Sequence, residues 1–190
     1  MILLRNNTYK MMAGKMRISL SLFLLLTALG LYGQDTAKSA THSSDTESIQ
    51  SLLDAYYGCI SGPIGEKRDF DRLRNLFHPQ ARLIYSYWNE ASSKAGVLVF
   101  DEVEEFIERL DYLDKKGFYE HELSNITHEF SSIVQVFSSY AFRAEDNSIP
   151  EGKGITSYEL FFDGKRYWIM SMFWAAENEK YKIPPKYLAR

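Results

Sequence analysis

The chain is short of the residues that metal and redox sites need. Its 190 residues include one cysteine, Cys59, and four histidines. A single cysteine excludes an internal disulfide and any cysteine-based metal site. No His-x-His or His-x-x-x-His spacing occurs, so we expect no metal site. Cys59 falls on a predicted core helix, where a small buried apolar role is expected.

Motifs for nucleotide binding and for nucleophilic catalysis are also missing. The sequence has no Gly-rich phosphate loop, no nucleophile elbow and no Cys/His dyad. We therefore expect no cofactor. No internal repeat is visible, so the chain is not predicted to be a solenoid or an array.

Long apolar runs are limited to one near the amino terminus. Residues 18–32 are apolar, four basic residues precede them, and Gly33-Gln34 follows. This order is typical of a secretory signal peptide over residues 1–33, cleaved near Gly33-Gln34, and predicts a secreted or periplasmic protein. The run is short for a membrane span, although an uncleaved anchor is the alternative. Translation could also begin at Met11, Met12 or Met16.

Charge and length bound the rest of the chain. Removing four basic and no acidic residues from the chain's 22 and 25 leaves 18 against 25, a net charge of −7. An acidic surface argues against nucleic acid, or a membrane once the signal is removed, as the partner. Residues 34–47 are polar and predict a disordered tether. Residues 48–190 are enough for one domain with one core.

The first half of this domain has helical periodicity. Apolar residues recur on one helix face from Ile49 to Ile60, and Ser61-Gly62-Pro63 stops that helix. Asp69 can cap a second, short helix that Pro79 ends. Residues 81–88 predict a strand and residues 89–96 a loop. Asp101 with Glu104 resembles a capping box for a third helix, which Gly117 closes.

The second half predicts strands, at residues 120–130, 133–143, 155–162 and 167–175, with a β-hairpin turn at Asp163-Gly164. Helices first and strands afterwards predict an α+β domain. Its helices would cover one face of a mostly antiparallel sheet.

Two segments resemble a known family. Asp69–Leu83, with Leu76-Phe77-His78-Pro79 at its centre, resembles the second helix and first strand of the nuclear transport factor 2-like superfamily. Tyr167–Trp174 resembles its last strand. The resemblance covers about residues 48–187. It implies a strongly curved sheet wrapped around N-terminal helices, a cone-shaped α+β barrel with an internal pocket. The superfamily includes SnoaL-like cyclases, ketosteroid isomerase, dehydratases, epoxide hydrolases and binding modules without catalysis.

Ketosteroid isomerase chemistry does not carry over through this resemblance. The position of its general base is Tyr85 here, and that of its protonated aspartate is Tyr158. Its oxyanion tyrosine matches Tyr57. Both carboxylates are thus replaced, and a tyrosine of ordinary pKa is a poor base at neutral pH.

Strand alternation, together with the isomerase resemblance at Tyr57 and Tyr85, assigns the side chains that face the pocket of such a cone. The residues assigned to it either fill the cone as core or line a cleft for a small apolar ligand. They are Tyr57, Tyr85, Tyr158, Phe162, Trp168, Met170, Met172 and Trp174. The opposite face, with Phe161, Ile169 and Phe173, is too aromatic to lie in water alone. We expect a homodimer through this outer sheet face.

Two histidines are candidates for catalysis. His78 precedes Pro79 at a helix end, where it can interact with the last carbonyls. His128 shares a predicted strand face with Ile126 and Phe130, so it either points inward as a base or is a structural histidine.

Three functions remain open from the sequence. The leading hypothesis is a binding module for a small apolar ligand or a partner, without catalysis. The alternative is a SnoaL-like isomerase, dehydratase or hydrolase acting on a small apolar substrate, using His128 with Tyr57, Tyr85 or Tyr158. The third is an interaction role through the outer sheet face. An enzyme would require an ionisable group with a shifted pKa inside a solvent-reachable cavity.

Overall fold

The computed structural model describes residues 42–149 and 151–188. The expected signal peptide and most of the expected tether lie outside these ranges. From Ser44 onward the chain forms one compact unit. None of the described helices is long and apolar enough to cross a membrane. The helical elements are η1 (Ser43–Thr46), α2 (Ile49–Ile60), α3 (Phe70–Leu76), α4 (Val103–Leu110), α5 (Leu113–Lys116) and η2 (Pro185–Tyr187).

Helix α2 begins and ends as its sequence predicts. The Ser48 hydroxyl accepts a hydrogen bond from the Ser51 N–H, and the Ser51 hydroxyl accepts one from the Ser48 N–H, which closes a capping box. After Ile60 the chain turns at Ser61 and Gly62. The helix buries one apolar face completely, with Leu52 and Leu53 fully inaccessible to solvent. This face is what the spacing of apolar residues predicted.

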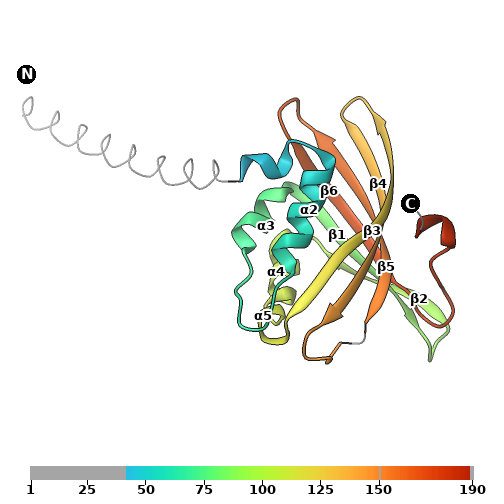
Figure 1. Ribbon diagram of the computed structural model, residues 1–190. Coiled ribbons are helices and arrows are strands. Elements are labelled where there is room, and N and C mark those ends of the chain that lie inside the picture. Colours follow the sequence, from blue (N-terminus) through green and yellow to red (C-terminus); the bar gives the residue numbers. More distant parts are fainter. Residues whose placement is uncertain (1–41, 150, 189–190) are drawn as a thin grey trace, which may run out of the picture. The chain divides into compact units, whose positions relative to one another are not determined.

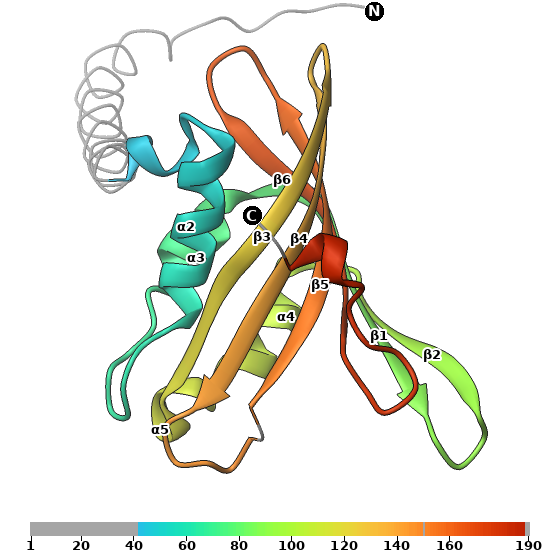
Figure 2. The ribbon, with the colours of Figure 1, turned by 45° about the vertical axis from the view of Figure 1, so that its right-hand side comes forward.

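Six strands form one sheet in the described part of the chain. They are β1 (Phe77–Asn89), β2 (Lys94–Phe100), β3 (Phe118–Phe130), β4 (Ile133–Ala144), β5 (Gly152–Phe162) and β6 (Tyr167–Ala176). The spatial order is β2-β1-β6-β5-β4-β3, and every pair is antiparallel except β1 with β6. The sheet curls around the helices without closing (Figures 1 and 2). The predicted α+β class with a strongly curved, mostly antiparallel sheet is confirmed.

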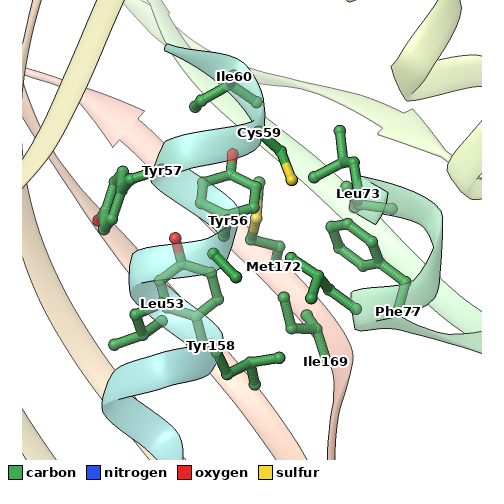
Figure 3. Close-up of a cluster of buried hydrophobic side chains, with 14 of the residues drawn as sticks. Leu53, Tyr56, Tyr57, Cys59, Ile60, Leu73, Phe77, Tyr158, Ile169 and Met172 are labelled. Carbon is green, nitrogen blue, oxygen red and sulfur yellow. The ribbon is translucent and has the colours of Figure 1, made fainter. Parts of the chain in front are cut away.

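The core lies between α2, α3 and the concave face of the sheet (Figure 3). Tyr56 packs edge-on against Tyr57, Phe77 and Tyr158, with ring centroids 5.4, 6.4 and 5.9 Å apart. Cys59 is 2% exposed in this core, as expected for a small apolar side chain. Burying several aromatic rings supplies a large apolar area in a domain of this size.

Three local predictions differ from the structure. Strand β1 begins at Phe77, ahead of Pro79. The register of its pairing with β6 shifts between Phe77 and Arg82, and a proline is tolerated at such an interruption because its missing N–H is not needed for the ladder. Strand β2 occupies part of the expected loop at residues 89–96. The N-cap position of α4 is Glu102 and not Asp101; the Glu102 side chain makes no capping hydrogen bond, and the Asp101 carboxylate pairs with Arg82.

The unit includes residues assigned to the tether. Residues 43–46 form η1, and the Asp45 carboxylate, which is largely buried, accepts hydrogen bonds of 2.7 and 2.8 Å from the Arg72 guanidinium. A two-pronged contact of this kind is geometrically specific. It joins the start of the unit to α3.

The carboxy-terminal tail, residues 177–188, lies on the convex face of the sheet. Tyr181 packs edge-on against Trp88 of β1, and Tyr187 packs against Phe137 of β4. The Ser139 hydroxyl donates to the Tyr187 carbonyl at 2.6 Å, and Ile183 is buried. The tail therefore covers part of the face that the sequence left aromatic and unpartnered (Figure 2).

The surroundings of two glycines predict opposite effects of a substitution by alanine on stability. A Cβ at Gly154 of β5 would overlap the buried Tyr140 ring and lie 2.6 Å from the Ala175 carbonyl oxygen, whereas one at Gly58 of α2 meets nothing within 4 Å. We expect Gly154→Ala to lower the free energy of unfolding by about 1–3 kcal/mol. Gly58→Ala should raise it by about 1 kcal/mol through helix propensity. Urea denaturation of both variants measures this, and equal effects would contradict the packing described.

Candidate ligand pocket

A cavity of about 230 Å³ lies between the concave face of the sheet and helices α2, α4 and α5. Seven of its thirteen lining residues are aromatic, so its wall is mainly ring surface. We call it the aromatic pocket. It is lined by Tyr56, Ile60, Tyr85, Phe100, Phe106, Arg109, Leu110, Tyr112, Leu113, Phe118, Glu120, Thr156 and Trp174.

The end of α2 is joined directly to the start of β3, which fixes one side of the pocket. Gly62 and Phe118 exchange two backbone hydrogen bonds, of 2.8 and 3.0 Å. The Ser61 hydroxyl accepts from the Glu120 N–H at 2.9 Å and donates to the Glu120 carbonyl at 3.0 Å. Tyr56 and Ile60 of α2 therefore face Phe118 and Glu120 of β3 at a fixed distance. The Ser61-Gly62 segment that stops the helix also positions the site.

Stacked rings form the opposite wall. Trp174 of β6 stacks parallel to Phe100 of β2, with centroids 6.2 Å apart and planes at 8°. Its ring also meets Phe106 of α4 edge-on at 5.7 Å and Tyr85 of β1 at 5.6 Å. Such contacts hold large side chains in defined positions at little entropic cost. The wall is therefore built before any ligand binds.

Glu120 places a carboxyl group inside this ring-lined space. The strand pairing puts Glu120 on the concave face, and the residue is partly buried. Its backbone groups are bonded to Ser61, while among the described residues the structure shows no hydrogen bond or ion pair to its carboxyl group. Burial raises the pKa of this carboxyl from its usual 4.5 to about 8. At neutral pH the group is therefore largely protonated.

The phenols around Glu120 are held neutral. Burial, followed by the charge of Glu120, raises the pKa values of Tyr56, Tyr112 and Tyr140 above 10. Neutral phenols can donate or accept hydrogen bonds but do not remove a proton at neutral pH. Among the described residues that line the pocket, Glu120 is thus the group able to exchange a proton near pH 8. Arg109 of α4 also lines the pocket, and its side chain is exposed to solvent.

The structure brings together only part of the set predicted for the pocket. Tyr85 and Trp174 line it. Tyr158 and Met172 are fully buried in the core beside it, on the same concave face (Figure 3). The Tyr158 hydroxyl makes no hydrogen bond within the described residues. Phe162 lies near the far end of β5 and packs against Tyr167, with centroids 4.8 Å apart.

Tyr57 is directed to a second hollow instead. Its hydroxyl lies 3.3 Å from the Ser138 hydroxyl, which donates to the Glu122 carboxylate at 2.7 Å. Tyr57, His121 and Glu122 help to line a hollow of about 340 Å³ beside α2. The tyrosine that matches the isomerase's oxyanion donor therefore lies outside the lining of the aromatic pocket.

A β-bulge in β6 explains why two residues predicted for the pocket lie outside it. Leu160 of β5 pairs with Ile169 and Glu159 pairs with Ser171, so Met170 is an extra residue in β6. The side-chain alternation changes phase there. Trp168 consequently lies on the convex face, where its ring meets His78 at 5.8 Å and the Arg166 guanidinium at 3.7 Å. Ile169, expected outside, is fully buried, and neither Trp168 nor Met170 lines the pocket.

A second bulge, in β3, sets the orientation of His128. The pairing of β3 with β4 shifts between Glu122 and Ser124, which leaves Leu123 as the extra residue. His128 lies beyond the shift, opposite Gln135, and is exposed on the convex face. Of the two alternatives left open for His128, the inward orientation is therefore not observed, since it assumed unbroken alternation.

Sequence reasoning missed Glu120, Phe118 and the helix residues Phe106 and Leu110. The available signal was the alternation of Phe118, Glu120 and Glu122 ahead of the bulge, which puts a carboxylate in phase with an inward ring. A group of three or more His, Cys, Asp or Glu side chains suited to a metal ion is absent from the described part of the chain.

Comparisons with known proteins identify the fold. No protein-family model matches the sequence, and no curated protein matches it. Solved structures do match. One is a nuclear transport factor 2-like protein of unknown function from Pseudomonas putida, with 10% identity, TM-score 0.53, and coverage of 77% of this chain and 94% of that one.

Two further structures agree with this match. The β subunit of a putative aromatic-ring-hydroxylating dioxygenase from Novosphingobium aromaticivorans is 15% identical, with TM-score 0.51 and coverage of 73% and 92%. Nuclear transport factor 2 from Cryptosporidium parvum is 12% identical, with TM-score 0.50 and coverage of 72% and 95%. The chain therefore has the nuclear transport factor 2-like fold, as the two sequence segments indicated. At these identities the likeness concerns fold alone.

The buried carboxyl predicts a pH-dependent stability difference. Because the folded-state pKa of Glu120 is raised, the unfolded chain ionises first as pH rises, and folding is disfavoured progressively from about pH 4.5 to pH 8. Glu120→Gln removes this effect. We expect the variant to exceed the native chain in free energy of unfolding by up to a few kcal/mol at pH 8, with the difference shrinking towards pH 5.

Urea unfolding at pH 5, 6, 7 and 8 measures this difference. Glu122→Gln is the matched control, because Glu122 lies outside the aromatic pocket. A Glu120→Gln difference that is constant across the four pH values would contradict the assignment of the titrating group.

Proposed function

We propose that this domain binds a small, largely apolar molecule in the aromatic pocket. The observation that carries the proposal is a preformed, ring-lined cavity into which a few polar side chains also project, which is the usual composition of a ligand site. Its volume of about 230 Å³ is below the ~300–1,000 Å³ typical of drug-sized sites. A molecule of one or two rings suits it. The polar contacts would come from Glu120, Thr156 and the phenols of Tyr56 and Tyr85.

A second candidate function is proton transfer by a SnoaL-like enzyme. It is favoured by Glu120, whose raised pKa and position in a solvent-reachable cavity suit a general acid or base. An enzyme that uses His128 as its base has no support, because the His128 side chain is exposed. Binding without turnover remains the leading proposal, since a preformed cavity suffices for it. Export from the cell, expected from residues 1–33, stays a prediction.

Filling the pocket should abolish binding. Leu110 ends α4 and lines the cavity, so Leu110→Trp would put an indole ring into it. We expect affinity for acetophenone and 2-naphthol, measured by ligand-observed NMR and calorimetry, to fall at least about tenfold, which is ~1.4 kcal/mol. Conversion of either probe during the titration would favour the enzyme instead.

Ile64→Trp is the control, because it adds the same ring in the exposed loop after α2, where Ile64 is 52% accessible. This variant should bind as the native chain does. Equal binding by Leu110→Trp and Ile64→Trp would place the ligand elsewhere, and absence of binding by the native chain to a panel of one- and two-ring compounds would contradict the proposal.

We also propose that the uncovered part of the convex face contacts a second copy of the chain. Beyond the tail, this face exposes apolar side chains on several strands. They include Val97, Val99, Ile126, Phe130, Ile133 and Phe173. Exposed large apolar side chains gathered on one face commonly mark an interface. A two-fold arrangement would cover the convex faces of both copies at once.

Sedimentation velocity tests the second copy. We expect the native chain, without residues 1–33, to sediment as a dimer and Phe173→Glu as a monomer, because a charge would be buried at the interface. Ile64→Glu, in the exposed loop after α2, should leave the dimer intact. A native chain that sediments as a monomer at all accessible concentrations would exclude this interface.

A further inference from the structure

We propose that the aromatic pocket selects an organic cation, a one- or two-ring molecule bearing a basic or quaternary nitrogen, with the Glu120 carboxylate as its counter-ion. This inference names the ligand class of the proposed function and depends on it. Two features of the described pocket carry it: a carboxyl group without a partner and a surrounding shell of aromatic rings.

The first feature is an uncompensated acid. A buried carboxylate is normally paired with a cation or with several hydrogen-bond donors. At Glu120 the described residues show neither, although the neighbouring Glu122 accepts bonds from Ser138 and Asn125. Arg109, the cationic residue of the lining, is exposed to solvent, and the structure shows no ion pair between it and Glu120. A cationic ligand would supply the missing counter-charge.

The second feature is the ring shell. Tyr56 and Phe118 adjoin Glu120 from α2 and β3, and the Trp174, Tyr85 and Phe100 cluster closes the other side. Aromatic faces attract cations, and quaternary ammonium groups are recognised by such cages. A carboxylate within a cage adds a charge that a site for a neutral apolar ligand does not need. The chain's net charge of −3 also favours cations over anions.

Other charged and titratable groups near Glu120 do not obscure its effect. They come from α2 (Tyr56 and Tyr57), β1 (Tyr85), α4 and the turn after it (Arg109 and Tyr112), β4 (Tyr140) and β5 (Tyr158). Burial raises the pKa values of the phenols at 56, 57, 112, 140 and 158 above 10. Between pH 6 and pH 8, Glu120 is therefore the group whose titration should govern binding.

The sign of the pH effect separates a cation from a neutral ligand. A cation binds the ionised carboxylate, so its affinity rises with pH and levels off above the pKa of about 8 in the free protein. A neutral ligand with a carbonyl group accepts a hydrogen bond from the protonated acid, so its affinity is flat below pH 8 and falls above it. An anion should bind weakly throughout.

Three one-ring probes make the test: benzyltrimethylammonium, acetophenone and benzoate, titrated calorimetrically from pH 6 to pH 9. We expect benzyltrimethylammonium to bind the most tightly at pH 8, with an affinity that rises by up to about tenfold per pH unit between pH 6 and pH 8. Glu120→Gln should abolish this rise and the preference for the cation while still binding acetophenone. Glu122→Gln should behave as the native chain.

Each outcome decides one proposal. Tighter binding of acetophenone than of benzyltrimethylammonium at pH 8, or an unchanged cation affinity in Glu120→Gln, would overturn the cation inference and leave the pocket as a site for neutral molecules. Absence of binding by all three probes, in a native chain whose fold is confirmed by circular dichroism, would overturn both the inference and the proposed function.

Discussion

The attachment of α2 to β3 is the constraint on which the rest of the structure depends. Four hydrogen bonds join Ser61 and Gly62 to Phe118 and Glu120. They fix the end of the helix against the start of a strand that is distant in sequence, since Ser61 and Glu120 are 59 residues apart. The helix cannot slide along the concave face without breaking them. Its buried face packs against the strands on one side (Figure 3) and lines the aromatic pocket on the side of α4 and α5. We call these two sides the packed half and the open half.

The packed half stabilises the fold, and the open half holds the candidate ligand site. Leu52, Leu53 and Tyr158 fill the space between α2 and the strands, where removal of a large side chain would leave a cavity. Towards α4 and α5, Tyr56 and Trp174 line the aromatic pocket. A carboxyl group in this open half opposes folding at neutral pH, because it is ionised in the unfolded chain and must take up a proton when it is buried. A residue that lowers stability without structural need is a reasonable mark of a functional site.

The sequence was sufficient to predict the larger features. The helix from Ile49, its stop at Ser61-Gly62-Pro63 and the turn at Asp163-Gly164 follow from local chemistry, because capping, glycine and periodicity act over a few residues. The fold class followed from the order of helices and strands. Two residues of the predicted set, Tyr85 and Trp174, line the aromatic pocket. Trp174 was assigned by strand alternation and Tyr85 by the resemblance to ketosteroid isomerase, and the two residues pair across adjacent strands.

The remaining positions depended on features that alternation cannot reveal. One inserted residue in β6 and one in β3 reversed the orientation of Trp168 and His128, and nothing local in the sequence marks either bulge. Glu120 was missed for a different reason. A glutamate between Tyr119 and His121 looks solvated until α2, α4 and α5 are placed over it, and that placement depends on contacts across the whole domain.

The most direct test of this account is the pKa of Glu120 itself, measured by the carboxyl carbon shift in a ¹³C-glutamate-labelled chain and assigned by comparison with Glu120→Gln. The account predicts a resonance that titrates near pH 8, well apart from those of exposed glutamates. A midpoint near the ordinary value of 4.5 would show that the carboxyl is solvated or paired, and the pocket described here would lose its defining group.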